Sequence, residues 1–351
     1  MANKINIQID TGEFVEANSP FIISASRSTD IPAFYSDWFF NRLEKGYSAW
    51  TNPFNNVKSY VSYINTKFIV FWSKNPKPLL EHIDKLNEKH IGCYIQYTLN
   101  DYVTEGLETN VSSIDDRIDT FKRLVDKIGY NGVIWRFDPL ILTDKINENS
   151  LIEKISNIGN KLKEYTEKMV FSFADIEKYP RVVNNLKNAN IHYKEWSAHE
   201  MQEFGEKLVN LNKSEGWNYE LATCGEAAKI PGIIHNKCID DNLIIRRTYN
   251  DNELMDYLKV KFYDPSETDL FGDPILIPDN AIKLDNGKYA VSGASKDGGQ
   301  RLFCGCIDSK DIGQYNTCVH GCAYCYANTG KSLAAANYKK YLTCKNKDSI
   351  C

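Results

Sequence analysis

Short apolar runs alternate with amphipathic stretches through most of the chain. The apolar runs have the length and composition of buried strands, and they lie at 21–26, 48–52, 68–72, 93–99, 133–137, 169–173 and 219–223. Apolar residues at helical spacing fall between them, at 35–45, 79–90, 114–128, 151–165 and 198–212. Strands that alternate with helices predict βαβ units and therefore a parallel sheet.

The number of predicted strands favours a closed arrangement. Seven strands with intervening helices are many for an open sheet of this length, so we expect an α/β fold with a TIM-like (βα) barrel, complete or partial. A strand pair is predicted in 1–20, around the turn sequence Asp10-Thr11-Gly12, and a hairpin in 283–291. The predicted organisation is an N-terminal strand pair in 1–20, the barrel in 21–250, and a C-terminal segment, 251–351, packed at the barrel mouth.

Polar residues gather where the predicted strands end. Parallel barrels carry their functional groups at the carboxyl ends of the strands, and Arg136 and Asp138 flank Phe137 there, so their side chains point the same way and can form an ion pair. Some of these polar residues are open to a simpler interpretation, since Asp30 before Ile31-Pro32 is also typical of a helix cap. The candidate catalytic residues are Arg27, Asp30, Lys74, Gln96, Arg136 and Asp138.

Composition and charge narrow the class of partner. The chain has 351 residues, of which 42% are hydrophobic and 25% charged, with a net charge of −4 and a pI near 5.9. This charge supplies no overall field for nucleic acid and argues against long nucleic-acid contacts. Since no run of about 18 apolar residues occurs and the N-terminus lacks the pattern of a signal peptide, we expect a cytoplasmic protein without membrane partners.

Three of the ten cysteines form a compact motif near the C-terminus. In reducing cytosol, clustered cysteines are more often metal ligands or catalytic groups than disulfides. Cys318, Cys322 and Cys325 have the spacing C-x3-C-x2-C, with Tyr324 directly before the third. Three thiolates can hold three irons of a [4Fe–4S] cluster and leave the fourth open. The alternative is a zinc knuckle that His320 or another cysteine closes.

This motif resembles the signature of the radical SAM superfamily, and its Cys-Tyr-Ala ending is similar to spore photoproduct lyase and its relatives. The resemblance implies an oxygen-sensitive [4Fe–4S] cluster on the three cysteines, with S-adenosylmethionine (SAM) bound at the open iron. Reductive cleavage of SAM would then yield a 5′-deoxyadenosyl radical. Tyr324 would lie where the aromatic residue of the superfamily approaches the adenine. A helix is expected to begin near Ala323.

The wider chain also resembles a bacterial family of barrel proteins of unknown function that carry this motif near the C-terminus. The resemblance runs from Ser24-Ala25-Ser26-Arg27 through Cys304-Gly305-Cys306 to Tyr324-Cys325-Tyr326-Ala327-Asn328. In most radical SAM enzymes the motif follows the first strand, and a Gly-Gly-Glu segment holds SAM; this chain has neither feature. The implied partners are an unidentified polar substrate (a small molecule, nucleotide or peptide) and an electron donor such as flavodoxin or ferredoxin.

Four further cysteines have the number and chemistry of a second metal site. Cys304 and Cys306 lie just before the motif, Cys224 ends the last predicted strand, and Cys238 follows it. Soft thiolate ligands select iron–sulfur clusters or zinc, so the site would hold either a second [4Fe–4S] cluster or a zinc ion. Alternatively, Cys224 and Cys238 are buried small hydrophobic residues.

Two other functional classes stay open. One is a binding or repair protein in which the iron–sulfur or zinc site is structural and SAM is not cleaved. The other is a metal-dependent hydrolase, which ranks last because the predicted strand ends lack the histidine and aspartate ligands that it needs.

Overall fold

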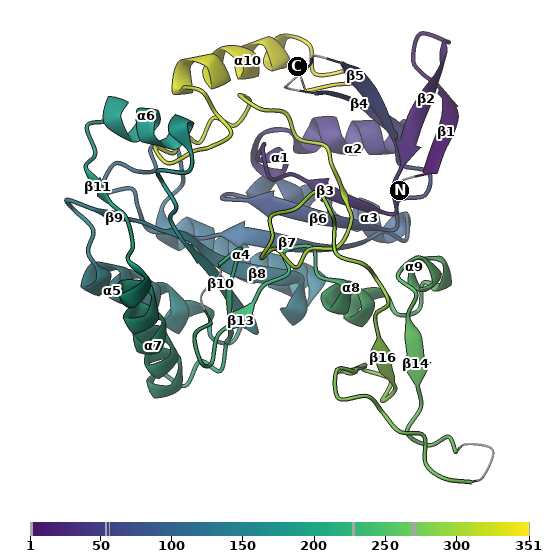
Figure 1. The fold of residues 1–351 in the computed structure, drawn as a ribbon. Helices are drawn as coiled ribbons and strands as arrows, with labels where there is room; N and C mark the ends of the chain where they lie inside the picture. Colours follow the sequence, from purple (N-terminus) through teal and green to yellow (C-terminus); the bar gives the residue numbers. More distant parts are fainter. Residues whose placement is uncertain (1–2, 53–54, 56, 227–228, 269–271, 351) are drawn as a thin grey trace.

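A parallel sheet forms the centre of the molecule in the computed structural model, which describes residues 3–52, 55, 57–226, 229–268 and 272–350 (Figure 1). Among these residues the sheet has eight strands in the order β13-β12-β10-β8-β7-β6-β3-β17, and all neighbouring pairs are parallel. Their bounds are β3 Ile22–Ala25, β6 Phe68–Ser73, β7 Gly92–Thr98, β8 Val133–Leu140, β10 Lys168–Phe173, β12 Glu220–Thr223, β13 Ile234–His235 and β17 Lys310–Asp311.

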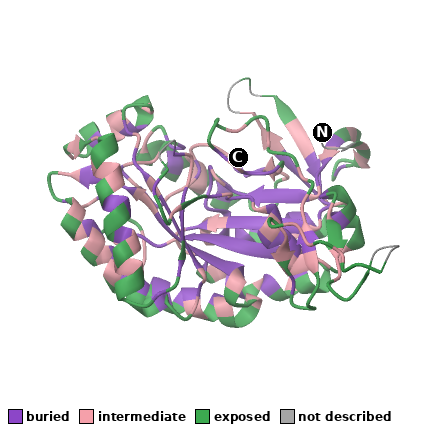
Figure 2. Ribbon diagram, turned by 60° about the horizontal axis from the view of Figure 1, so that its bottom comes forward, coloured by how far each residue is buried: buried purple, intermediate pink, exposed green. Residues whose placement is uncertain are grey.

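Helices and the C-terminal segment cover the two faces of this sheet. One core contains the strand residues on one face of the sheet. The helices that pack on this face are α2 (Ser36–Glu44), α4 (Ile114–Ile128), α5 (Glu148–Leu162) and α7 (Ala198–Ser214). The other contains the alternate strand residues with α8 (Asp241–Thr248) and α9 (Asn252–Tyr257). In β6, for example, Ile69 and Phe71 enter the first core, whereas Phe68 and Val70 enter the second. Burial on both faces explains the uninterrupted apolar runs (Figure 2).

The prediction of a (βα) barrel, complete or partial, is wrong. The sheet is open, because its edges are the two-residue strands β13 and β17, which pair only with β12 and β3 in the described residues. One predicted strand is also missing from it. Residues 48–51 of this predicted strand belong to β4 (Tyr47–Thr51), which pairs antiparallel with β5 (Lys58–Ser62) in a separate sheet. The short connection between β4 and β5 favours an antiparallel pair, since a parallel pair needs a longer crossover.

The predicted N-terminal strand pair joins that separate sheet. β1 (Asn3–Gln8) and β2 (Phe14–Ser19) are antiparallel, and the four strands have the order β1-β2-β5-β4. Most of the other predicted elements also form, although 79–90 divides into the 3-10 helix η1 (Lys77–Glu81) and α3 (Ile83–Glu88). The helices α1 (Ile31–Phe34), α6 (Pro180–Asn188) and α10 (Lys331–Thr343) were not predicted, nor were α8 and α9.

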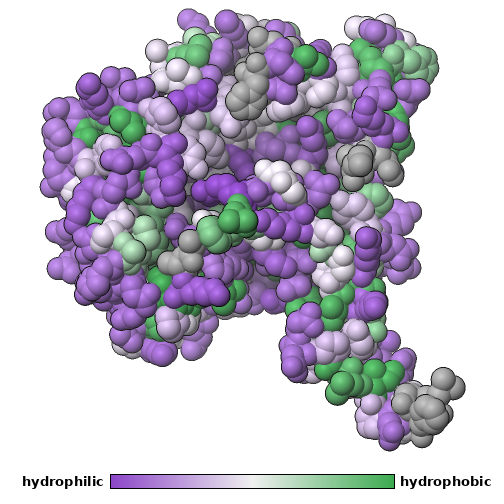
Figure 3. All heavy atoms as spheres, viewed as in Figure 1, coloured by the Kyte–Doolittle hydropathy of each residue, from purple (hydrophilic) through white to green (hydrophobic). Residues whose placement is uncertain are grey.

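The C-terminal part of the chain returns across the sheet. Between α9 and β17 it forms an arm that projects from the body, with the strands β14 (Lys261–Tyr263), β15 (Ile282–Lys283) and β16 (Tyr289–Val291) (Figures 1 and 3). The predicted hairpin in 283–291 is the β15–β16 pair. The segment then adds β17 beside β3 and ends with α10 over α1 and α2. Smaller strands β9 (Leu142–Thr143) and β11 (Tyr193–Lys194) form a separate pair. Within the described residues, no helix has the length and apolarity that a bilayer crossing requires.

Candidate functional site

A cavity of about 380 Å³ lies at the carboxyl ends of the parallel strands. Its wall consists of residues at the ends of β3, β6, β8, β10 and β12, together with residues from 300–327 of the C-terminal segment. Open α/β sheets bind ligands beyond the carboxyl ends of their strands. The cavity thus lies at the strand ends where the candidate catalytic residues were predicted, although the sheet is open.

All seven cysteines predicted to bind metal line this cavity, in two groups. The cysteine loop, residues 318–325, carries Cys318, Cys322 and Cys325. The four-cysteine group consists of Cys224, Cys238, Cys304 and Cys306.

The cysteine loop is bonded to two parts of the sheet's rim. His320 Nε2 lies 2.7 Å from the carboxylate of Asp30, and its Nδ1 lies 3.1 Å from the carbonyl oxygen of Asn110. The backbone N–H of Asn110 donates to the carbonyl of His320, and that of Ala323 to the carbonyl of Leu107. Because both ring nitrogens of His320 are engaged, His320 is a poor fourth ligand for a zinc knuckle.

Gly321 allows the loop to turn between its first two cysteines. Its φ is +71°, and a Cβ there would lie 2.6 Å from Thr109 Oγ1, so no other residue fits without strain. The helix expected near Ala323 is absent. Residues 321–330 are turns and bends, and the helix α10 begins only at Lys331.

Burial and mutual repulsion hold the loop thiols in their neutral form. Burial raises the pKa of Cys318, with further increases from Asp30, Cys325 and Cys322. Burial also raises the pKa of Cys322 to about 12, and that of Cys325 rises for the same reason. The loop sulfurs therefore affect one another by charge, yet no hydrogen-bonding contact joins them in the described part of the chain. Three such thiols need a cation before all can ionise.

The sulfurs of the four-cysteine group, by contrast, touch one another. Cys224 Sγ lies 3.3 Å from Cys238 Sγ, and the nearby thiol of Cys306 lowers the pKa of both Cys238 and Cys304. Three separate segments bring them together: the end of β12, the loop before α8, and the strand-less stretch before β17. The sequence predicted this convergence from cysteine number alone.

Several N–H groups point at these sulfurs. Arg136 Nη1 lies 3.2 Å from Cys238 Sγ, Asn236 Nδ2 lies 3.1 Å from the same sulfur, and the backbone N–H of Ile239 donates to Cys306 at 3.3 Å. Contacts with Cys224 and Cys306, helped by Arg136, lower the pKa of the Cys238 thiol well below its ordinary value.

Two of the candidate catalytic residues, Arg27 and Arg136, lie over the ring of Trp72. The guanidinium groups of Arg27 and Arg136 lie 5.4 and 5.2 Å from the centre of its ring. Arg136 forms the expected ion pair with Asp138, and Gln96 accepts a hydrogen bond from Arg136 at 3.1 Å. Gln96 does not line the cavity and lies behind Arg136. The other five candidate catalytic residues do line it.

The side chains of Asp30 and Lys74 contact residues of the cysteine loop, His320 and Tyr324 respectively. Asp30 caps α1, as its alternative interpretation suggested, and also accepts hydrogen bonds from Ser73 Oγ and the backbone N–H of Lys74. Lys74 Nζ lies 2.7 Å from Glu108 and donates to the Tyr324 hydroxyl at 2.8 Å.

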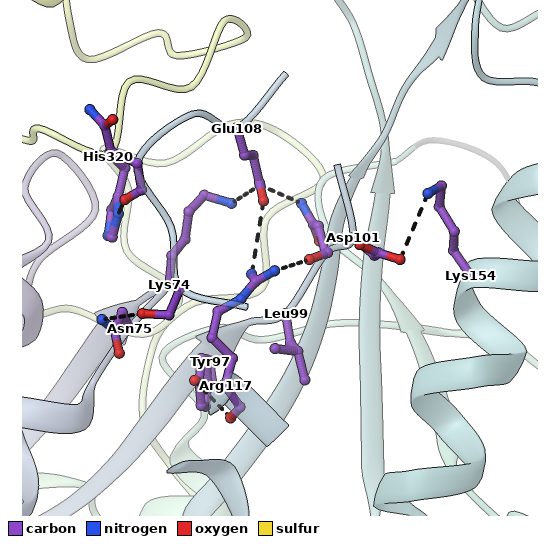
Figure 4. A network of polar contacts seen from close by, with 12 residues as sticks. Lys74, Asn75, Tyr97, Leu99, Asp101, Glu108, Arg117, Lys154 and His320 are labelled. Atoms are coloured by element: carbon purple, nitrogen blue, oxygen red, sulfur yellow. Dashed lines mark hydrogen bonds and ion pairs between the residues drawn. The ribbon is translucent and has the colours of Figure 1, made fainter. Parts of the chain in front are cut away.

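Glu108 is the centre of a buried network (Figure 4). Its carboxylate pairs with Lys74, lies 3.8 Å from Arg117 Nη1, and accepts a hydrogen bond from the Tyr324 hydroxyl. Burial alone would raise the pKa of Glu108, but the charges of Lys74 and Arg117 outweigh it and lower that pKa. The network fixes the side chain of Tyr324. Tyr324 lines the same cavity, as do Cys322 and Cys325.

Residues 22–327 match the model of a family described as a domain of unknown function, DUF1848. The chain belongs to this family. The match includes every strand of the parallel sheet and all seven cysteines of the two groups. No curated protein and no solved structure matches the chain. The DUF1848 match by itself assigns no activity to the chain.

The residues present fit thiolate-bound metal by their donor chemistry. In the described chain, no group of three or more histidine, cysteine, aspartate or glutamate side chains is placed so that it could hold a metal ion. Seven cysteines nevertheless share one cavity, and N–H groups already point at the sulfurs of Cys238 and Cys306. Such donors are typical of the surroundings of metal-bound thiolates.

Three residues of the DUF1848 site were not among the predicted ones. Glu108 lies in the irregular segment after β7, where no pattern marks a functional carboxylate. Trp72 belongs to an apolar strand and was assigned to the core. Glu226 lines the cavity beside Cys224, where burial and the Asp175 carboxylate raise its pKa to about 7. A search for polar residues just beyond strand ends favours Glu226 but neither of the others.

Proposed function

We propose that this protein is a radical SAM enzyme that reductively cleaves SAM at a [4Fe–4S] cluster bound by Cys318, Cys322 and Cys325. The observation that carries the proposal is the placement of the C-x3-C-x2-C motif on the wall of a cavity at the carboxyl ends of a parallel sheet. The sulfurs share this cavity without hydrogen-bonding to one another. This suits a cubane, in which each thiolate binds a different iron.

The residues around the loop would position it and exclude water. When bound, the cluster and SAM supply the electron and the 5′-deoxyadenosyl radical. The Asp30–His320 contact holds the loop against the end of β3, and the hydrogen bond from the backbone N–H of Asn110 holds it against the segment after β7. The Lys74–Glu108 pair fixes the Tyr324 hydroxyl, so its ring keeps one orientation in the wall, where we propose that adenine binds.

The rest of the rim would recognise the substrate. Arg27 and Arg136 lie over Trp72, and Ser172 donates a hydrogen bond to Asp138 in the same wall. This combination of cations, hydroxyl and carboxylate suits a polar small molecule, nucleotide or peptide. An electron donor such as flavodoxin or ferredoxin would supply the reduced state.

The competing function is a binding or repair protein whose iron–sulfur or zinc site is structural. The two functions differ in whether SAM is consumed. The engaged ring nitrogens of His320 weigh against its simplest form, a zinc knuckle closed by that residue.

The decisive experiment measures 5′-deoxyadenosine after anaerobic reconstitution with iron and sulfide, with dithionite as reductant. We expect 5′-deoxyadenosine from SAM and absorbance near 400 nm that fades in air. Cys322→Ala should abolish both. Cys344→Ala, which removes an exposed cysteine far from the motif, is the matched control and should retain both. A reconstituted protein that carries the cluster but forms no 5′-deoxyadenosine would refute the proposal.

A further inference from the structure

The four-cysteine group lies in the interior, unlike a set of surface thiols. The exposed fractions of Cys238, Cys306 and Cys304 are 3, 1 and 8%. Cys224 is half-buried and packs against the same core. Free cysteine is an ordinary core residue, so burial alone does not indicate a metal.

The polar groups around the sulfurs distinguish this group from a hydrophobic contact. Arg136 is itself 3% exposed, and its guanidinium donates to Cys238 rather than to solvent. The side chain of Asn236 and the backbone N–H of Ile239 donate to Cys238 and Cys306. An apolar pocket for neutral thiols would not require a buried cation and two further donors, because uncompensated polar groups are costly to bury.

We propose that Cys224, Cys238, Cys304 and Cys306 bind a single zinc ion with four thiolate ligands. With a zinc–sulfur distance of about 2.3 Å, a tetrahedral site places its sulfurs about 3.8 Å apart. The observed separation of 3.3 Å between the sulfurs of Cys224 and Cys238 is close to this size, and Cys304 and Cys306 line the same cavity. A cubane separates its ligand sulfurs much further, because each binds a different iron.

Binding requires the cysteine side chains to move. Within the described residues the four sulfurs are not arranged around one point, and the sulfurs of Cys224 and Cys238 lie 3.3 Å apart. Rotation of Cys224 and Cys304 toward the central pair would close the tetrahedron. The central pair, Cys238 and Cys306, already has its N–H donors in place.

The surrounding charge suits the product. Four thiolates and Zn²⁺ together carry two negative charges. The Arg136 guanidinium donates to Cys238 while it is also paired with Asp138, and Arg27 lines the same cavity. Outer partners of metal ligands commonly hydrogen-bond the ligand atoms in this way.

A site with four protein ligands has no open coordination position, so this zinc would be structural. It would join the end of β12 and the loop before α8 to the stretch that leads into the cysteine loop. Backbone hydrogen bonds already follow this path, from Ile307 N–H to the Ile239 carbonyl and from Asp297 N–H to the Cys306 carbonyl. The zinc is separate from the proposed SAM chemistry and does not depend on it.

The test uses full-length protein with Cys318, Cys322 and Cys325 all replaced by alanine, so that only the four-cysteine group can bind. We expect about one zinc ion per chain by elemental analysis, without acid-labile sulfide. Exchange with Co²⁺ should give the visible d–d bands of a tetrahedral thiolate site. Adding Cys238→Ser to this background should remove the zinc, whereas adding Cys344→Ser should leave it.

The Co²⁺ spectrum is recorded before any ligand of the group is changed, so a misfolded Cys238→Ser protein cannot obscure the result. A chain that binds no metal, or that binds about four irons with sulfide at these cysteines, would overturn the zinc site. Since SAM cleavage is not measured, these outcomes are independent of the proposed radical chemistry.

Discussion

The two cysteine groups share one cavity but differ in how their sulfurs meet. In the cysteine loop, one short segment carries all three thiols, which act on one another through charge. In the four-cysteine group, three distant segments bring the sulfurs into contact and surround them with N–H donors. Cysteine counting alone does not show this difference in sulfur spacing, on which the two proposed sites, a cluster and a single ion, depend.

The supporting residues differ as well. A buried carboxylate network around Glu108 and the Asp30–His320 contact stabilise the loop. A buried arginine, the Asn236 side chain and the backbone N–H of Ile239 contact the four-cysteine group. Changes on one side should therefore leave the other largely intact.

The largest effect should come from exchanging one ligand on each side. Cys322→Ala should abolish SAM cleavage but retain zinc, whereas Cys238→Ser should lose zinc and destabilise the fold by more than about 4 kcal/mol, as loss of a structural metal does. Metal analysis and denaturant unfolding of both variants measure this difference. If either substitution removes both metals, the two sites are not independent.

Next in size is Glu108→Gln, which removes the anion from the loop's buried network. Lys74 and Arg117 would then lack their common carboxylate, and breaking such a buried pair costs about 3–5 kcal/mol. Because the folded-state pKa of Glu108 is lowered, its stabilisation is present above the unfolded value of about 4.3 and is lost as pH falls through the folded value. Unfolding curves should thus show the difference from wild type narrowing below about pH 4. A difference independent of pH would contradict the assigned role.

A smaller effect is expected from His320→Gln, which weakens the bond between the loop and Asp30. Hydrogen bonds to charged groups contribute about 1.5–3 kcal/mol, and the loss should fall within that range. Limited proteolysis should show faster cleavage within 316–328, with zinc content unchanged. Protection equal to wild type would show that Asn110 and Leu107 suffice to hold the loop.

The smallest change should follow Arg136→Lys on the opposite side. Lysine keeps the charge but cannot donate to Cys238, Gln96 and Asp138 together. We expect zinc affinity to fall about 10–100-fold, the range for outer partners of metal ligands, measured by competition with a chromophoric chelator. An unchanged affinity would remove Arg136 from the metal's surroundings.

Sequence patterns predicted the strands and helices better than their assembly. The strands of 68–72, 93–99 and 133–137 form as expected, because buried parallel strands require continuous apolar runs. The β pattern of residues 48–51 would suit either sheet, and their short link to β5 favours the antiparallel pair that forms. The hydrophobic pattern of a strand does not show which neighbouring strand it pairs with.

The site shows a similar limit. Spacing identified the loop cysteines and strand ends located Arg136 and Lys74, since both signals are local. Glu108 acquires its role only from Lys74 and Arg117, which the fold brings from other segments. A lone carboxylate in an irregular segment has no such signal of its own.

The pairing of β17 with β3 has a consequence for biosynthesis. Asp311 accepts hydrogen bonds from Ser24, Ser26 and the backbone of Arg27, so the first strand of the sheet is completed by residues made nearly three hundred positions later. A ribosome-bound chain shorter than about 310 residues leaves that edge of β3 uncovered, and an unpaired edge strand is a template for association with other chains. Stalled or truncated products are therefore the forms most exposed to aggregation.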